Sequence, residues 1–463
     1  MTRVVVPERA IGASATQVAT GRLSQILAAN IVFVLTIFPF FQIVPVLSSE
    51  VQPVAGVIGF GVWLFGGRKS GLAAALAPLL CVLALYGVVA VTLVELGAAP
   101  SQVVYTAEAV AIILAPVGVL LCLKPRIHLL SPQVLTWCMA LWAGLGTLQL
   151  FASSLLLRSG VSGLLALAIP RTSSQSALAA TGRGVDMFAP EPSYAAASIV
   201  FMMAAAAWMF ATGAMGRRRF ALLVALALWM TFLNQSVTLA ITLVGGAMVV
   251  ALVTARRHPI TLLTALILGV GGLFTLSSAQ HSASRPIRVA AQLATVVTTG
   301  DLNLDSLLAV STLNGNGRLA TVVQGYAGAA ANDGLGLGLG SWASQITAAD
   351  NGTIVTSTAL KPFGYAPFVA MTLGFPGLVA LLYALARLGA QTCRAAPRSL
   401  AVATVFVAVI GIIANSPASL PSYWAVLIFG YAYSQAPTGI RMVRFKEGAG
   451  SLAGLGVQAG DLR

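Results

Sequence analysis

The chain has 463 residues, of which 58% are hydrophobic and only 8% are charged. Soluble domains carry about 25% charged residues, so this composition excludes an ordinary water-facing surface. The formal net charge is +14, but no basic stretch has the interleaved aromatic residues of a nucleic-acid site, and we expect no nucleic-acid partner.

Apolar runs separated by short polar links follow a polar N-terminal tail, residues 1–24. Runs of about 20 residues predict transmembrane helices, because a helix of that length satisfies its own backbone hydrogen bonds within the bilayer. The first run lacks a small-residue cleavage pattern, so we expect an uncleaved helix. We predict an all-α polytopic membrane protein with about twelve spans. They are 26–47, 51–66, 72–95, 103–123, 133–157, 192–213, 220–234, 236–254, 260–279, 363–386, 400–414 and 421–436.

The basic residues predict which side of the membrane each link occupies. With the N-terminus inside, seven of the 26 Lys and Arg residues fall outside, all on or beside two long loops. This asymmetry favours cytoplasmic termini and places the multi-pass chain in a bacterial inner membrane. The segments are then a tail at 1–24, helices one to nine at 25–279 with a periplasmic loop at 158–190, a large periplasmic loop at 280–362, three helices at 363–436 and a tail at 437–463. Spans 220–234 and 236–254 are short, and a re-entrant pair is the alternative to two crossings.

The first candidate cluster lies where the shorter periplasmic loop enters a predicted helix. It runs from Arg183 to Tyr194 and contains Glu191 directly before Pro192. Pro192 suits the first helical position, and a carboxylate suits the positive end of the helix dipole. Glu191 is therefore either a stabilising group at a helix start or a carboxylate that binds or activates a hydroxyl group.

The second candidate cluster is basic and belongs to the large loop. Arg285 and Arg288 share one face of a predicted amphipathic helix, and Arg318 follows later in the same loop. Guanidinium groups match phosphate oxygens in pairs and stay protonated. The alternatives are binding to lipid headgroups, or pairing with Asp301 and Asp305.

Three further residues are candidates for separate reasons. His281 has a pKa suited to a general base, although a lone interfacial histidine is commonly structural. Glu108 lies roughly 9 Å along the fourth predicted helix, where a carboxylate is functional, paired with an arginine or protonated. Asp333 opens a glycine-rich stretch that ends at Gly340. This stretch lacks the spacing of a nucleotide-binding loop and predicts a compact turn.

The sequence contains no motif for a disulfide framework, a metal site, a nucleotide-binding loop or a Ser-His-Asp triad. The four cysteines have neither the spacing of metal ligands nor that of a disulfide framework. P-loop and Ser-His-Asp signatures do not occur. We therefore expect a protein that uses no metal and no cofactor.

Four stretches resemble motifs of the O-antigen polymerase and O-antigen ligase family. Arg183 followed by Phe188-Ala-Pro-Glu-Pro-Ser-Tyr-Ala195 looks like the family's signature before a helix, in the form similar to exopolysaccharide polymerases. The others are Asn234–Ala240, which looks like a turn between helices, Gly317–Arg318 with Gly334–Trp342, which looks like the large-loop motif, and Gly374–Leu378, which looks like the helix start after that loop. The matched region covers about residues 180–380.

The resemblance implies a GT-C-like fold and a glycosyltransferase that needs no metal. Its donor and acceptor would be undecaprenyl-diphosphate-linked oligosaccharides in the lipid bilayer, and a flippase and a chain-length regulator would be partners. Taken with the residues described above, the candidate catalytic residues are Arg183, Arg318, Glu191 and His281. Arg285, Arg288, Asp333, Tyr194 and Glu108 are candidate substrate-binding residues.

Two departures from the family pattern bear on the mechanism. Val237 stands where the family commonly has an arginine, and Asn332-Asp333 stands where ligases often have His-Pro. These departures disfavour a ligase-type histidine mechanism and require Arg183 and Arg318 to carry more of the phosphate contact. The alternatives to a polymerase are a ligase that passes glycan to lipid A core or to protein, and a twelve-helix secondary transporter. A transporter would usually show repeated halves, which are not evident.

Overall fold

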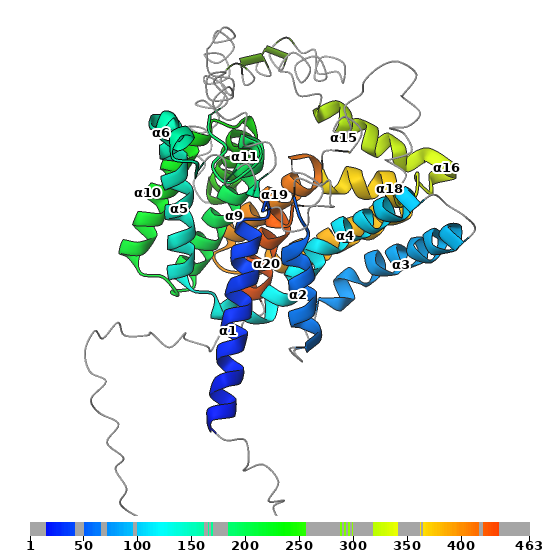
Figure 1. Ribbon diagram of the computed structural model, residues 1–463, viewed down its shortest axis with the longest axis horizontal. Coiled ribbons are helices and arrows are strands. Elements are labelled where there is room, and N and C mark those ends of the chain that lie inside the picture. The colour runs from blue at the N-terminus through cyan, green and yellow to red at the C-terminus, as the bar shows by residue number, and fades with distance from the viewer. Residues whose placement is uncertain are drawn as a thin grey trace, which may run out of the picture.

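The structure is a computed structural model of the whole chain (Figure 1). It describes residues 15–41, 51–65, 72–95, 100–161, 184–255, 318–340, 364–415 and 420–434, and single residues at 165, 168–169, 288, 291–292, 295–296, 299 and 362. Within these residues every regular element is a helix. The helices are α1 (Ala15–Ile37), α2 (Val54–Phe65), α3 (Ala73–Glu95), α4 (Pro100–Leu123), η1 (Lys124–Leu129), α5 (Pro132–Phe151), α6 (Ser153–Arg158), α9 (Pro192–Ala211), α10 (Arg217–Asn234), α11 (Val237–Ala255), α15 (Arg318–Ala327), η3 (Gly328–Ala330), α16 (Ala331–Gly334), α18 (Tyr365–Thr392), α19 (Arg398–Ile410), η6 (Gly411–Asn415) and α20 (Ser422–Ser434).

Several of these helices have the length and composition of membrane spans. In the described part of the chain, 5 helical segments are long and apolar enough to cross a bilayer, and four shorter apolar helices accompany them. The described part of the chain is therefore all-helical and suited to crossing a membrane several times. The predicted span at 260–279 lies outside the described residues.

The core is organised around α20, which lies at the centre of the bundle (Figure 1). From Leu420 to Phe429 nearly every side chain of this segment is buried. Helix α20 packs against α9, α18, α19 and α4. A helix that is apolar on all sides belongs in the interior of a bundle. The residues of α20 are mostly apolar around the whole helix, which agrees with its buried position.

Helices α2 and α4 pack backbone to backbone. Gly56 faces Ala115 and Gly59 faces Gly118, and a Cβ atom at either glycine would overlap the backbone of α4. Small residues allow this close approach between helices in lipid, where dispersion contacts replace the hydrophobic effect as the driving force. The pair forms a rigid wall on one side of the bundle.

Several predicted spans differ from the observed helices. Helix α1 begins at Ala15, inside the predicted N-terminal tail of residues 1–24, and the predicted span 133–157 is divided at Ala152 into α5 and α6. Helix α1 ends at Ile37, ten residues before the predicted end, because Pro39 follows and disfavours helical backbone in the residue before it.

Helix α18 is interrupted at Gly374, where φ is 60° and ψ is −157°. Its first part, from Tyr365 to Gly374, is buried on all sides, whereas its second part exposes side chains such as Val379 and Leu382.

Helix α15 covers the buried first part of α18. Gly325 packs against Pro362 and Pro367, and Gly328 packs against Met371. The Tyr326 hydroxyl donates a hydrogen bond to the carbonyl oxygen of Ile413 at 3.0 Å. Burial raises the pKa of Tyr326 to about 12, so its hydroxyl remains a donor at physiological pH. These contacts fix the segment that begins at Arg318.

Candidate active site

Met187 is held from both sides of its backbone by one glutamine side chain. The Gln149 amide nitrogen, on α5, donates to the Met187 carbonyl oxygen at 3.1 Å, and the Met187 N–H donates to the Gln149 amide oxygen at 2.8 Å. Both residues are buried, and Met187 has a left-handed φ of 56°. A non-glycine residue in that conformation needs surrounding contacts to hold it. Gln149 supplies them.

Asn234, the last residue of α10, holds the same segment from the other side. Its amide nitrogen donates to the Pro192 carbonyl oxygen at 2.8 Å and to that of Val185 at 3.4 Å. The Val185 N–H donates to the Leu233 carbonyl oxygen at 3.0 Å. Gly184, with φ of 77°, lies so close to the Asn234 carbonyl that no side chain fits. The segment from 184 to 192 is therefore docked onto the α10–α11 turn.

Glu191 and Tyr194 stand at the start of α9, as the sequence predicts. Glu191 is the N-cap residue of α9 and Pro192 occupies the first turn. The Ser193 hydroxyl donates to a Glu191 carboxylate oxygen at 3.5 Å. The Tyr194 ring stacks on Phe40, with ring centroids 6.1 Å apart. Glu191 is partly exposed, so its carboxylate is accessible while its backbone is fixed.

The glycine-rich stretch folds into the compact turn that the sequence predicts. Asn332 and Asp333 have left-handed φ values of 52° and 57°, and the Asn332 amide nitrogen donates to the Gly336 carbonyl oxygen at 2.7 Å. The Leu337 N–H donates to the Met371 carbonyl oxygen at 2.7 Å. Gly336 rests on the backbone of Gly374, at the interruption of α18.

The same turn is tied to α3 and α4. The Tyr86 hydroxyl on α3 donates to the Leu335 carbonyl oxygen at 2.7 Å, and the Thr106 hydroxyl on α4 donates to that of Leu339 at 3.3 Å. Gly340 packs against Thr106. Glu108 follows two residues later on α4 and is only 4% exposed. The turn thus contacts the middle of α3 and the first part of α4.

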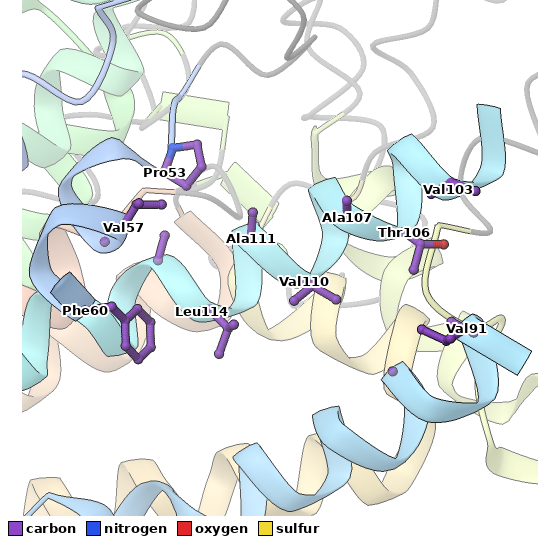
Figure 2. Close-up of a pocket in the computed structure, with 14 residues that line it drawn as sticks. Pro53, Val57, Phe60, Val91, Val103, Thr106, Ala107, Val110, Ala111 and Leu114 are labelled. Atoms are coloured by element: carbon purple, nitrogen blue, oxygen red, sulfur yellow. The ribbon is translucent and has the colours of Figure 1, made fainter. Parts of the chain in front are cut away.

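An apolar groove extends from this turn along α2, α3 and α4 (Figure 2). Its volume is about 730 Å³, and among the described residues that line it only Thr106 has a polar side chain. The groove is open to the side, because the lining residues Val57, Val91 and Val103 are 64%, 59% and 41% exposed.

The structure places some of the predicted site residues and not others. Glu191 and Tyr194 lie at the α1–α9 junction, Asp333 lies in the turn beside α18, and Glu108 lies on α4. Arg288 is on a helical turn, and Arg318 is the first residue of α15. Arg183, His281 and Arg285 lie outside the described residues, as does the side chain of Arg318. Among the residues with a described position, no cluster of three His, Cys, Asp or Glu has the geometry to hold a metal ion.

Sequence reasoning missed Gln149, Tyr86 and Thr106, which hold the two segments in place. Gln149 is a polar amide inside an apolar run, and that position alone was a signal, because polar groups at membrane depth usually have a partner. Tyr86 and Thr106 gave no comparable signal, since hydroxyl groups commonly bond to their own helix.

No protein-family model matches the chain, and none of the curated proteins compared with it matches its sequence.

Proposed function

We propose that the chain is a polysaccharide polymerase of the O-antigen or exopolysaccharide type. It transfers glycan from a polyprenyl diphosphate carrier to a lipid-linked repeat unit at the periplasmic face of the bacterial inner membrane. The proposal includes twelve spans in a GT-C-like arrangement, with cytoplasmic termini and both long loops on the periplasmic side. That topology follows from the distribution of Lys and Arg along the sequence.

One observation carries the proposal: the four motifs that suggest this family meet in two pairs. The segment before α9 is hydrogen-bonded to the Asn234 turn. The glycine-rich turn is seated on the Gly374 interruption of α18. Each contact joins two motifs that are far apart in the sequence, and chain connection alone does not require them to touch. The contacts therefore support two built pairs rather than four chance likenesses.

The proposed reaction needs an acceptor hydroxyl, a proton acceptor and an anion site. The hydroxyl oxygen bonds to the anomeric carbon of the donor glycan, and the bond from that carbon to the diphosphate oxygen breaks. The hydroxyl proton passes to the Glu191 carboxylate, and the diphosphate leaves with the bonding electrons. Guanidinium groups of Arg183 and Arg318 stabilise its charge without a metal.

Substitution of these residues tests the proposal in cells. We expect Arg183→Ala, Arg318→Ala and Glu191→Gln each to abolish long polymer while the protein remains in the membrane at normal abundance. Arg171→Ala, an arginine of the same loop outside the motif, is the matched control and should leave polymer unchanged. Normal polymer length in all three variants contradicts the proposal.

A deletion strain separates the polymerase from a ligase. Loss of long chains with single repeat units still attached to the acceptor supports a polymerase. Loss of all attachment, with polymer retained on its carrier, supports a ligase instead. Uptake of a solute into vesicles by purified protein, without any lipid-linked donor, supports a transporter.

A further inference from the structure

Five exposed arginines gather at the end of the bundle that lies away from the candidate active site. They belong to the link between α9 and α10, to the last part of α18 and to the link between α18 and α19. Helix α9 begins beside Glu191 and runs for 20 residues, about 30 Å, before it reaches this end. We name these residues the arginine patch: Arg217, Arg218, Arg387, Arg394 and Arg398.

The fold brings the two links to the same end of the bundle. The Trp208 indole N–H, near the end of α9, donates to the Thr404 hydroxyl of α19 at 3.0 Å, and the Trp208 ring stacks on Tyr433 of α20 with centroids 5.7 Å apart. A Cβ atom at Gly430 of α20 would meet both Trp208 and Thr392, the last residue of α18. The ends of α9 and α18 and the first part of α19 therefore surround the end of α20.

The helices that carry or adjoin the patch supply no negative charge to it. Helices α9, α10, α18, α19 and α20 contain neither Asp nor Glu. Arg217 and Arg218 lie in the first turn of α10 and Arg398 is the first residue of α19, where the positive end of the helix dipole disfavours a cation. An anion bound among these guanidinium groups would offset both their mutual repulsion and this helix-end effect.

The surroundings of the patch favour a lipid anion over a soluble acidic protein. About one helical turn from the arginines, the apolar side chains of Leu222 on α10 and Leu382 on α18 are 50% and 46% exposed. The Arg387 guanidinium lies over the Tyr383 ring, 5.9 Å from its centroid. Aromatic rings and the long side chains of arginine gather at headgroup level in membrane proteins. A phosphate joined to acyl chains would contact the arginines and this apolar surface together.

We propose that the arginine patch binds the phosphate groups of anionic phospholipids in the leaflet at this end of the bundle. Under the proposed topology this is the cytoplasmic leaflet. Forked guanidinium groups bind phosphate oxygens in pairs and stay protonated, so the site binds lipid throughout the physiological pH range. The site is separate from the proposed glycan transfer and does not depend on it.

Native mass spectrometry of the full chain in detergent tests the proposal, with phosphatidylglycerol and phosphatidylcholine added in equal amounts. Each lipid carries one phosphate, but only phosphatidylglycerol has a net negative charge. We expect the chain to retain phosphatidylglycerol in preference. Arg217→Gln, Arg218→Gln and Arg398→Gln, combined in one chain, should weaken its binding by about fivefold for each arginine removed.

Arg158→Gln is the matched control. Arg158 is an exposed arginine at the end of α6, which follows α5. Phe151 at the end of α5 stacks on Trp229 in the last part of α10, so Arg158 lies toward the opposite end of α10 from Arg217. This variant removes the same charge away from the patch and should retain phosphatidylglycerol as the parent does.

Photolabelling of the unsubstituted chain in nanodiscs decides the question even where the combined variant does not fold. The probe is phosphatidylglycerol with a diazirine in its acyl chain beside the glycerol, and adducts are located by mass spectrometry. We expect adducts around Leu222 and Leu382, and no competition by inorganic phosphate. Equal retention of the two lipids, equal labelling at both ends of the bundle, binding unchanged in a folded combined variant, or displacement by inorganic phosphate overturns the proposal.

Discussion

Asn234 and Gln149 are the side chains that fix the backbone before Glu191. Each is a buried amide that satisfies backbone groups of a segment without regular structure. Buried backbone groups require hydrogen-bond partners, and these two amides provide them. The position of Glu191 therefore depends on two residues that have no chemical part in the proposed reaction.

Replacement of Asn234 by Ala should weaken this segment. The Pro192 and Val185 carbonyl oxygens lose their bonds from this amide, and the loss of one hydrogen bond costs about 0.5–1.5 kcal/mol. We expect a lower unfolding temperature in detergent and faster proteolysis between residues 184 and 191. Thr92→Ala is the control, because Thr92 is an exposed residue bonded only within its own helix. Equal stability of the two variants would contradict this account.

At the scale of elements, the interruption of α18 at Gly374 is a fixed bend between the two parts of this helix. Gly374 combines a positive φ with contacts to Gly334 and Leu335 that leave no room for a side chain. The first part of α18 is buried under α15, and the second part faces outward. This bend therefore sets both the direction of the second part of α18 and the position of the glycine-rich turn that packs against it.

Gly374→Ala and Gly61→Ala should change stability in opposite directions. A side chain at Gly374 is strained and overlaps the turn, which we expect to cost about 1–3 kcal/mol or more. Gly61 lies within helix α2 with open space around its Cβ position, so alanine there should stabilise by up to about 1 kcal/mol. Thermal unfolding of both variants measures the change in stability. A Gly374→Ala protein as stable as the parent would contradict the proposed requirement for glycine at this bend.

At the scale of the whole molecule, the composition and the apolar runs were sufficient to predict helices at most of the observed positions. The start of α9 at Pro192 is confirmed, because Pro and a carboxylate at a helix start are local signals. The apolar run predicts an unbroken span at 363–386, since a glycine in such a run does not reveal what packs against it, although the resemblance marks Gly374–Leu378 as a helix start. The joining of the Asn234 turn to residues 184–192 is a tertiary contact that periodicity does not encode.

Cys393 reports on the proposed topology. It follows α18 and is partly exposed, whereas Cys122 and Cys138 are buried. Cys81 is exposed on α3, within a predicted membrane span, and is replaced by Ser in the protein used for labelling. We expect a membrane-impermeant maleimide to label Cys393 in inside-out vesicles but not in intact cells, with Cys393→Ser as the control. Labelling from the periplasmic side would contradict the proposed orientation.

The rate of this labelling should also depend on pH. Burial raises the pKa of the Cys393 thiol, and Arg398 opposes the shift. The thiolate is the reactive form, so a raised pKa lowers its fraction at neutral pH. Labelling should be slower than that of a free thiol at pH 7 and should accelerate as pH rises. A rate equal to that of a small thiol at pH 7 would show that the thiol is not shielded.

The most direct measurement is the reaction itself with purified protein. The full chain is reconstituted in liposomes with a polyprenyl-diphosphate-linked oligosaccharide as both donor and acceptor, and no nucleotide sugar is added. The account predicts a ladder of longer glycans with one free polyprenyl diphosphate released for each repeat unit joined, and loss of both products in Glu191→Gln. Unchanged oligosaccharide with no diphosphate released would contradict it.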